Sequence, residues 1–282
     1  MNGTKQLIRH ARDLVRTRAL PSFLRGLAKL HATSEFVVTG LPRSGTSLLC
    51  AQLNTSASAI CFNETVKSAH RLPTFFRDTR QKLTRGEPVE NRFDAGGELT
   101  TDTLRDGGEY RERRVQSYSK STALGAKATT LFLSELEIIL ALDYPIVVIM
   151  RDPLFSLLSW NSAAAGHIPE HTMTVEQRQT RFADVNFLTN DRYEMQAQIW
   201  EHFAHKIWEH RSEIRIVKYE SLVVDPEPVW AQIASYLDIR PVEADRSLSS
   251  RNDEARYAPE LVEDIRRAVD KYCPTRHHFG YE

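Results

Sequence analysis

From about residue 35 onward, short apolar runs alternate with longer stretches in which apolar residues recur every three or four positions. The apolar runs are typical of buried strands and predict them at residues 35–40, 59–64, 121–127, 145–150 and 214–220. The longer stretches predict helices at residues 46–54, 130–143, 152–165, 192–210, 226–239 and 259–273. Because strands and helices alternate, the pattern predicts an α/β fold in three layers, with a central parallel sheet and helices on both faces.

Two stretches interrupt this alternation, residues 65–120 and residues 166–190, and both are polar, charged and weakly periodic. Long excursions from a compact sheet are often binding loops or lids. We therefore expect these insertions to shape a substrate pocket. No Pro/Gly-rich linker separates them from the rest, so residues 34–282 are expected to form a single domain.

The first 33 residues differ in composition, since they carry seven Lys or Arg residues and one acidic residue, Asp13. Leucines lie between the charges, which predicts a basic helical segment that Pro21 interrupts. Two interpretations remain open for this segment. It either packs on the domain as a surface helix or makes peripheral contact with a membrane or a partner.

Charge and cysteine content narrow the function classes. The chain has 282 residues, with 37 basic and 37 acidic side chains, so bulk attraction to nucleic acid is not expected. Its three cysteines form no C-x-x-C pattern, which argues against a disulfide framework or a zinc site. A reducing, cytoplasmic location fits such a chain best. No apolar run approaches the ~20 residues that a membrane span requires.

The segment "GLPRSGTS", Gly40 to Ser47, lies between a predicted strand and a predicted helix. The first N–H groups of a helix have no partners within the helix and favour an anion. Gly40 and Gly45 allow the backbone to approach such an anion closely, and Ser44, Thr46 and Ser47 add hydroxyl donors. The segment therefore predicts an anion-binding loop.

This loop departs from the G-x-x-x-x-G-K-[ST] pattern of nucleoside triphosphatases at one position. Thr46 occupies the place of the lysine, and the nearest cation is Arg43. The strand at 145–150 is followed by Arg151 rather than by a magnesium-binding aspartate, and Asp152 is better placed to cap the next helix. Both departures argue against a magnesium–triphosphate ligand, so no metal is expected.

A second candidate anion site lies in "RDPLFSLLSW". Arg151 stands at the carboxyl end of a predicted strand, where open α/β sheets bind ligands, and Ser159 follows two helical turns later. A guanidinium suits a phosphate, so a single ligand held at two anionic points is one interpretation. An ordinary salt bridge at the strand end is the other.

Together, "GLPRSGTS" and "RDPLFSLLS" resemble the 5′-phosphosulfate loop and the 3′-phosphate motif of the sulfotransferases that use 3′-phosphoadenosine-5′-phosphosulfate (PAPS). "VKYESLVVDPE" and the closing "HHFGYE" are similar to further segments of that family. Arg43 brings the loop closer to the tyrosylprotein and bacterial members than to the soluble small-molecule branch, which has lysine there. The resemblance implies a P-loop NTPase-like fold and transfer of a sulfonyl group from PAPS to a hydroxyl or amine.

The resemblance also implies catalytic roles. Arg43 and Lys127 would neutralise charge on the departing oxygen, although Lys127 also fits a solvated lysine at a strand end. Glu64, directly after the second strand, matches the general base of the tyrosylprotein and heparan branches. His70 is the alternative base, because the soluble branch uses histidine and imidazole titrates near neutrality. A carboxylate in this role needs burial or a neighbour that raises its proton affinity.

Donor-binding roles follow in the same way. Tyr219 is expected to brace the strand end near the loop, and Arg251 is a candidate for the 3′-phosphate from a late loop. The expected donor-binding residues are Arg43, Ser44, Gly45, Thr46, Ser47, Arg151, Ser159, Tyr219 and Arg251.

Two other function classes remain open from the sequence. One is a nucleotide or nucleoside kinase with a non-standard loop, and the other is a non-catalytic nucleotide-binding module. The acceptor is also open, and a saccharide, a lipid or a small metabolite all fit the chain.

Overall fold

The computed structural model of the chain describes residues 35–100, 109–115, 118–162, 182–240 and 250–282. The basic segment predicted at residues 1–33 and most of the 166–190 insertion lie outside the described residues.

The described residues form a parallel sheet of five strands in the order β2-β5-β1-β6-β7. Its strands are β1 (Glu35–Gly40), β2 (Ala59–Asn63), β5 (Ala123–Lys127), β6 (Ile146–Met150) and β7 (Arg215–Lys218). The strands β1, β5 and β6 at its centre are almost entirely buried, as expected of parallel strands that are covered on both faces. The predicted α/β sheet is confirmed.

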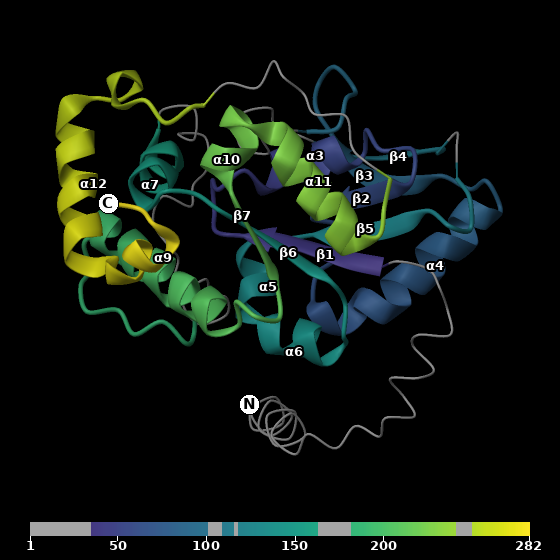
Figure 1. The fold of residues 1–282 in the computed structure, drawn as a ribbon, viewed down its shortest axis with the longest axis horizontal. Coiled ribbons are helices and arrows are strands. Elements are labelled where there is room, and N and C mark those ends of the chain that lie inside the picture. Colours follow the sequence, from purple (N-terminus) through teal and green to yellow (C-terminus); the bar gives the residue numbers. More distant parts are fainter. Residues whose placement is uncertain (1–34, 101–108, 116–117, 163–181, 241–249) are drawn as a thin grey trace. The chain divides into compact units, whose positions relative to one another are not determined.

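Helices cover both faces of this sheet (Figure 1). One face is covered by α3 (Thr46–Leu53), α10 (Tyr219–Val224) and α11 (Pro226–Leu237). The other is covered by α4 (Leu72–Thr84), α5 (Thr130–Ser134), α6 (Leu136–Ala141), α7 (Pro153–Asn161), α9 (Arg192–Glu209) and α12 (Pro259–Tyr272). Short 3₁₀ turns occupy Ala69–Arg71, Glu254–Arg256 and Pro274–Phe279. The predicted three-layer arrangement is therefore confirmed.

Three elements differ from the sequence prediction. The helix expected at 130–143 is divided at Glu135, whose backbone leaves the helical region while its carboxylate accepts hydrogen bonds from Ser68 and from the N–H of Ala69. The strand expected at 214–220 ends at Lys218, because Tyr219 begins α10. The 65–120 insertion contains regular structure that was not predicted, namely α4 and an antiparallel hairpin of β3 (Val89–Phe93) and β4 (Glu109–Arg113).

The free edge of β2 is covered by two asparagine side chains instead of another strand of the sheet. Asn54 Oδ1 accepts from the N–H of Cys61 at 3.1 Å, and Asn91 Oδ1 accepts from the N–H of Asn63 at 2.9 Å. The amide groups of both asparagines also donate to the carbonyl of Cys61. These bonds satisfy edge groups that would otherwise be unpaired, and they attach the hairpin to the sheet.

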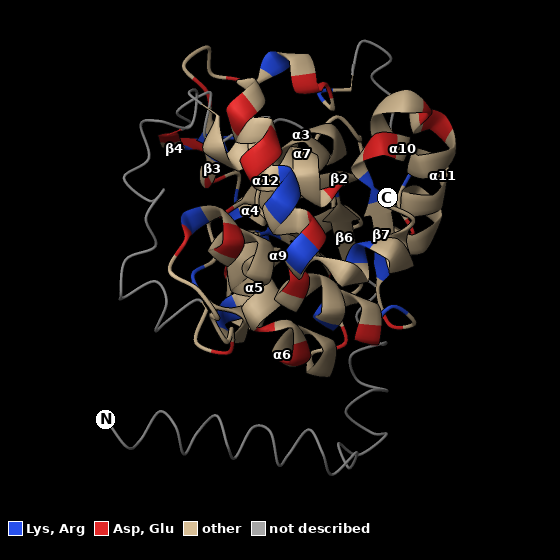
Figure 2. Ribbon diagram, turned by 90° about the vertical axis from the view of Figure 1, so that its left-hand side faces the viewer, with Lys and Arg blue, Asp and Glu red and all other residues tan. Residues whose placement is uncertain are grey.

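Charged side chains lie mainly on the outer surfaces of the helices. Figure 2 views the molecule from the side of α9 and α12 and shows Lys, Arg, Asp and Glu along both helices. Their apolar residues, such as Ile199 and Ile265, are fully buried. Within the described part of the chain, no helix has the length and apolar character needed to cross a bilayer.

Candidate active site

The candidate site lies at the carboxyl ends of the parallel strands. There β1 ends at Gly40, β5 at Lys127 and β6 at Met150, and the neighbouring strands are in direct register. The predicted loop follows β1 and leads into α3. The loop, Lys127 and Arg151 therefore share one edge of the sheet, where open α/β folds bind ligands.

The loop requires glycine at two positions, because a side chain at either one would collide with its neighbours. Gly45 has φ 97°, and a Cβ there would lie 2.8 Å from Tyr219 Cδ2. A Cβ on Gly40 would lie 2.3 Å from the carbonyl oxygen of Ile149. Gly45 is the N-cap of α3 and no side chain caps this helix, so its first N–H groups are suited to an anion. The hydroxyl of Ser44 donates to the carbonyl of Leu41 and so stabilises the turn.

The two predicted anion motifs contact each other directly. Arg43 Nε donates to Ser159 Oγ at 3.0 Å, and the carbonyl of Arg43 accepts from Arg151 Nη1 at 3.1 Å. Arg43 has φ 64°, a strained conformation for a side chain of its size, and it persists because these contacts hold it. These two hydrogen bonds thus join the loop to Arg151 and to α7.

Arg151 is 4% exposed, and contacts on several sides of its guanidinium fix its orientation. Its guanidinium stacks 4.6 Å from the centre of the Tyr219 ring, and its Nε donates to Asn252 Oδ1 at 2.8 Å. Its Nη2 is buried without a hydrogen-bond partner. Burial lowers the pKa of Arg151, and a guanidinium remains charged despite such a shift. Arg151 therefore retains one buried donor for a ligand.

In the late loop, Asn252 contacts Arg151, and the role of Arg251 at the 3′-phosphate stays a prediction. Arg251 is exposed, whereas its neighbour Asn252 contacts Arg151. Asp152 caps α7 as predicted, since its carboxylate accepts from the N–H of Leu154 at 2.8 Å. The sequence carries no periodic signal for Asn252, because a single polar contact in an irregular loop leaves no pattern.

Glu64 lies directly after β2 and forms two ion pairs. Its Oε1 is 2.8 Å from Lys127 Nζ, and its Oε2 is 2.7 Å from Arg92 Nη1. Burial raises the pKa of Glu64, but the charges and hydrogen bonds of Lys127 and Arg92 outweigh burial, and the net shift is downward. In this arrangement Glu64 is ionised and ready to accept a proton, but its proton affinity is low.

Lys127 is 1% exposed, so the solvated lysine that the sequence also allowed is wrong. Its Nζ donates to Ser47 Oγ at 3.1 Å as well as to Glu64. Ser47 belongs to the first turn of α3. The ammonium group therefore lies between the anion loop and Glu64, where it can contact both.

His70 is not part of this cluster. It is exposed and lies in a 3₁₀ turn, where its backbone N–H donates to Ser68 Oγ. Among the described residues, no hydrogen bond or ion pair connects its ring to Glu64 or to the loop. Arg92, which the sequence analysis did not identify, occupies the position beside Glu64 instead.

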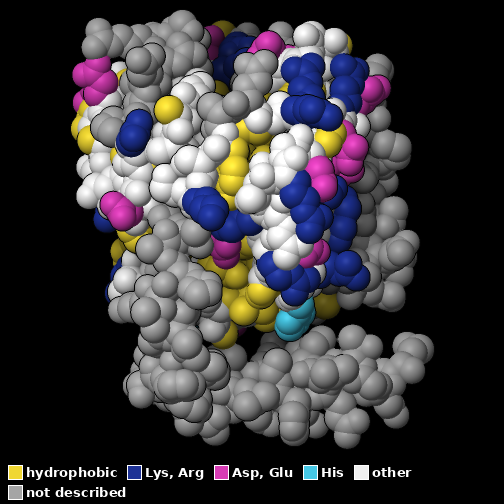
Figure 3. Space-filling view, turned by 90° about the vertical axis from the view of Figure 1, so that its right-hand side faces the viewer, with side chains coloured by type: hydrophobic (Ala, Val, Ile, Leu, Met, Phe, Trp, Pro, Cys, Tyr) yellow, Lys and Arg dark blue, Asp and Glu magenta, His cyan; other side chains and the backbone are white. Residues whose placement is uncertain are grey.

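The β3–β4 hairpin forms the outer wall beside Glu64. Tyr110 donates its hydroxyl to the carbonyl of Glu64 at 2.9 Å, and its ring lies below the cations of Lys67 and Arg92. Figure 3 shows Lys and Arg side chains on this face with acidic ones between them. Several of these charges form ion pairs, including Lys82 with Glu112, so the face is mixed rather than uniformly basic.

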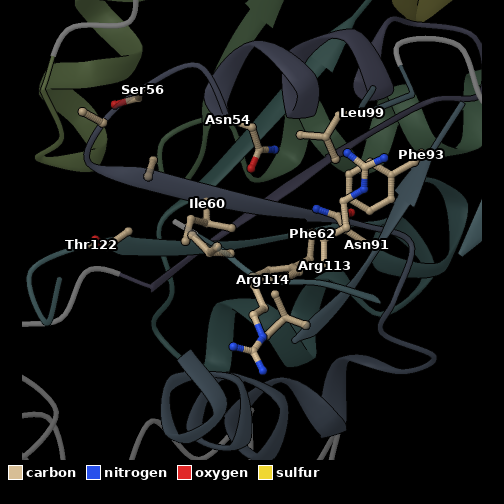
Figure 4. Close-up of a pocket in the computed structure, with 14 residues that line it drawn as sticks. Asn54, Ser56, Ile60, Phe62, Asn91, Phe93, Leu99, Arg113, Arg114 and Thr122 are labelled. Atoms are coloured by element: carbon tan, nitrogen blue, oxygen red, sulfur yellow. The ribbon is translucent and has the colours of Figure 1, made fainter. Parts of the chain in front are cut away.

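A cavity of about 230 Å³ lies between the edge of β2 and the hairpin. Phe62, Phe93 and other apolar side chains line it together with Asn54 and Asn91 (Figure 4). Arg113 extends across the ring of Phe93, whereas Arg114 points in the opposite direction. Its lining includes Phe62 on β2, two positions before Glu64 in the chain.

The described residues contain no group of three or more His, Cys, Asp or Glu arranged as metal ligands would be. All three cysteines are free and buried.

The model of the sulfotransferase family matches residues 35–243, which is more than half of the chain. The chain belongs to the sulfotransferase family. As a sulfotransferase, it moves a sulfonyl group from a nucleotide sulfate donor to an acceptor substrate. The family match therefore decides against the kinase and against the purely binding module.

Several solved sulfotransferase structures are similar to this sulfotransferase. The sulfotransferase domain of the Synechococcus PCC 7002 olefin synthase is 16% identical, with coverage of 89% of this chain and 96% of that chain and a TM-score of 0.44. The Alicyclobacillus acidocaldarius sulfotransferase is 12% identical, with coverage of 88% and 95% and a TM-score of 0.46. Mouse sulfotransferase SULT7A1, complexed with PAP, is 12% identical, with coverage of 90% and 86% and a TM-score of 0.37. No curated protein matches the chain.

Proposed function

We propose that the donor is PAPS and that it is held at two anionic points. The 5′-phosphosulfate lies in the loop, against the first N–H groups of α3 and the side chains of Arg43 and Ser47. The 3′-phosphate lies against Arg151 and Ser159. The observation that carries this proposal is the contact between the two motifs, because Arg43 bonds both Ser159 and Arg151.

Glu64 and Lys127 divide the chemical step between them. The acceptor oxygen or nitrogen attacks sulfur, the bond from sulfur to the bridging oxygen breaks, and adenosine 3′,5′-bisphosphate leaves. Glu64 takes the proton of the acceptor, while Lys127 and Arg43 stabilise the negative charge on the departing oxygen. Lys127 already contacts both Glu64 and the α3 turn, which supports this assignment.

The low proton affinity of Glu64 is adjusted by the same lysine. When the phosphosulfate enters the loop, Lys127 faces an anion there and moves away from Glu64. Glu64 then has one positive neighbour fewer to lower its pKa. Because burial still raises that pKa, the pKa of Glu64 rises. The donor thereby increases the basicity of Glu64 at the moment when a base is required.

We place the acceptor on the hairpin side of Glu64. The cavity beside β2 is lined by both apolar and polar side chains, which suits the body of a saccharide, a lipid head or a small metabolite. Its lining includes Asn91, and the next residue, Arg92, contacts the candidate base directly.

Ligand titration tests the donor assignment. Adenosine 3′,5′-bisphosphate is expected to bind without metal and more tightly than magnesium–ATP in calorimetry. Tighter binding of magnesium–ATP would overturn the assignment. Labelled PAPS incubated with extracts of the source cells, followed by mass spectrometry, would then identify the acceptor.

The pH dependence tests the environment of Glu64. Arg92→Gln removes one positive neighbour, so the pKa of Glu64 rises and the acid limb of the kcat/KM profile moves to higher pH. In the wild type that limb lies below the ordinary glutamate range, because the pKa is lowered. Arg111→Gln, which breaks an exposed ion pair on β4, serves as the control. An acid limb that stays in place in Arg92→Gln contradicts the assignment.

A further inference from the structure

Tyr281 is buried although it lies in the last described segment, far along the chain from the anion motifs. It is 5% exposed. Gly280 has φ 70° and turns the backbone back after the 3₁₀ turn, so that the Tyr281 ring lies 4.4 Å from Lys218 Nζ. The Tyr281 hydroxyl donates to Glu220 Oε2 at 3.1 Å. The closing "HHFGYE" segment and the "KYE" segment are therefore joined by this hydrogen bond and by a second one, from Lys218 Nζ to the carbonyl of Phe279 at 2.9 Å.

Glu220 transmits this contact toward the anion site. Its second oxygen, Oε1, accepts from Asn252 Nδ2 at 2.9 Å and from the N–H of Asp152 at 3.1 Å. Three donors thus fix the orientation of one carboxylate. Asp152 directly follows Arg151, so one of these bonds also holds the backbone at the start of α7.

Asn252 completes the connection. Its Nδ2 is held by Glu220, so its Oδ1 is presented to Arg151 Nε at 2.8 Å. Arg151 Nη1 is bonded to the carbonyl of Arg43, and Nη2 remains the buried donor without a partner. Two protein bonds therefore determine the plane of the guanidinium and the direction in which Nη2 points.

We infer that Tyr281 and Asn252 are positioning residues for donor binding: Asn252 orients Arg151 directly, and Tyr281 acts on it through Glu220 and Asn252. This inference rests on the proposed function, because it takes Arg151 as the group that receives the 3′-phosphate. A preorganised donor loses less conformational freedom on binding, so the network lowers the dissociation constant of the nucleotide. Neither residue touches the reacting atoms.

The Tyr281 hydroxyl is suited to this permanent role. Burial raises the pKa of Tyr281, and the nearby Glu220 carboxylate raises it further. The hydroxyl therefore stays protonated at neutral pH and remains a donor there.

Tyr281→Phe removes only the hydroxyl and keeps the ring. Adenosine 3′,5′-bisphosphate is expected to bind about two- to tenfold more weakly to this variant in calorimetry, the range expected for one net hydrogen bond. The KM for PAPS rises by a similar factor, while kcat at saturating donor and the acceptor KM stay unchanged. Asn252→Ala removes the direct contact with Arg151 and is expected to give the same pattern without any change to Tyr281.

Tyr272→Phe is a matched control, because Tyr272 also donates its hydroxyl to a glutamate at 3.1 Å, but to Glu194, which in the described part of the structure is not bonded to Glu220, Asn252 or Arg151. Equal weakening in Tyr272→Phe and Tyr281→Phe would overturn the inference. A double-mutant cycle adds a second test. If Tyr281 acts through Arg151, Tyr281→Phe weakens binding less in an Arg151→Lys background than in the wild type, and fully additive losses would overturn the inference.

The proposed function and this inference fail differently. If the wild type does not bind the bisphosphate, the donor assignment is wrong. If the wild type binds it and the affinities of Tyr281→Phe and Asn252→Ala equal that of the wild type, only the positioning role is wrong.

Discussion

Glu64→Gln is expected to lower kcat by about 10²- to 10⁴-fold, the usual contribution of a general base. Glutamine keeps the shape of the side chain but has no carboxylate to take the proton of the acceptor. Affinity for adenosine 3′,5′-bisphosphate does not fall, because Lys127 loses a counter-ion and remains available to an anion. Steady-state kinetics with PAPS and calorimetry with the bisphosphate measure the two effects separately.

Glu35→Gln provides the matched control for this substitution. Glu35 is a half-buried carboxylate paired with Arg80 at 3.1 Å, and it stands at the amino end of β1, opposite the site. Its replacement is expected to leave kcat near the wild-type value. His70→Gln tests the alternative base, and a large loss of kcat there, together with near-normal turnover in Glu64→Gln, would contradict the proposed mechanism.

Arg151→Lys is expected to weaken bisphosphate binding about 10- to 100-fold, which corresponds to roughly 1.5–3 kcal/mol for a hydrogen bond to a charged group. Lysine keeps the charge but has no planar fork, so it cannot contact Asn252, the Arg43 carbonyl and a phosphate in the same geometry. Calorimetry measures the affinity, and the loss is expected mainly in the KM for PAPS.

Arg80→Lys is a close control, because the three guanidinium nitrogens of Arg80 are bonded in the same pattern as those of Arg151. Its Nε bonds Glu35, its Nη1 bonds the carbonyl of Thr122, and its Nη2 is buried without a partner. It differs in its position at the amino end of the sheet. If both variants bind the bisphosphate as the wild type does, Arg151 does not hold the 3′-phosphate.

Much of the fold was readable from the sequence because the central strands are strongly apolar and the main helices are periodic. The α4 helix was missed although Leu72, Phe76, Thr79 and Leu83 repeat on one face, since all four of its charged residues follow Phe76 and interrupt the apolar pattern there. In β4 every residue is exposed, so burial imposes no apolar pattern on it. An apolar sequence pattern arises where apolar side chains are buried, and α4 and β4 bury few of them.

In the candidate site, too, some residues were predicted from the sequence and others were not. The loop and Arg151 were predicted because they follow strands, and strand ends of a parallel sheet meet at one edge, whereas Lys127 was predicted from the family resemblance. The neighbours of these residues were not predicted. Asn252 is separated from Arg151 by 101 positions, and Arg92 reaches Glu64 from a hairpin outside the sheet. Such contacts depend on tertiary structure, and nothing in their local sequence marks them.

The two asparagines on the β2 edge also bear on association between molecules. An exposed strand edge invites a strand of another chain, which is a common route to aggregation. On β2 the N–H groups of Cys61 and Asn63 and the carbonyl of Cys61 are already occupied by side chains. An incoming strand would have to displace both amides first. Resistance of this edge to aggregation therefore depends on two uncharged side chains rather than on repulsion between charges.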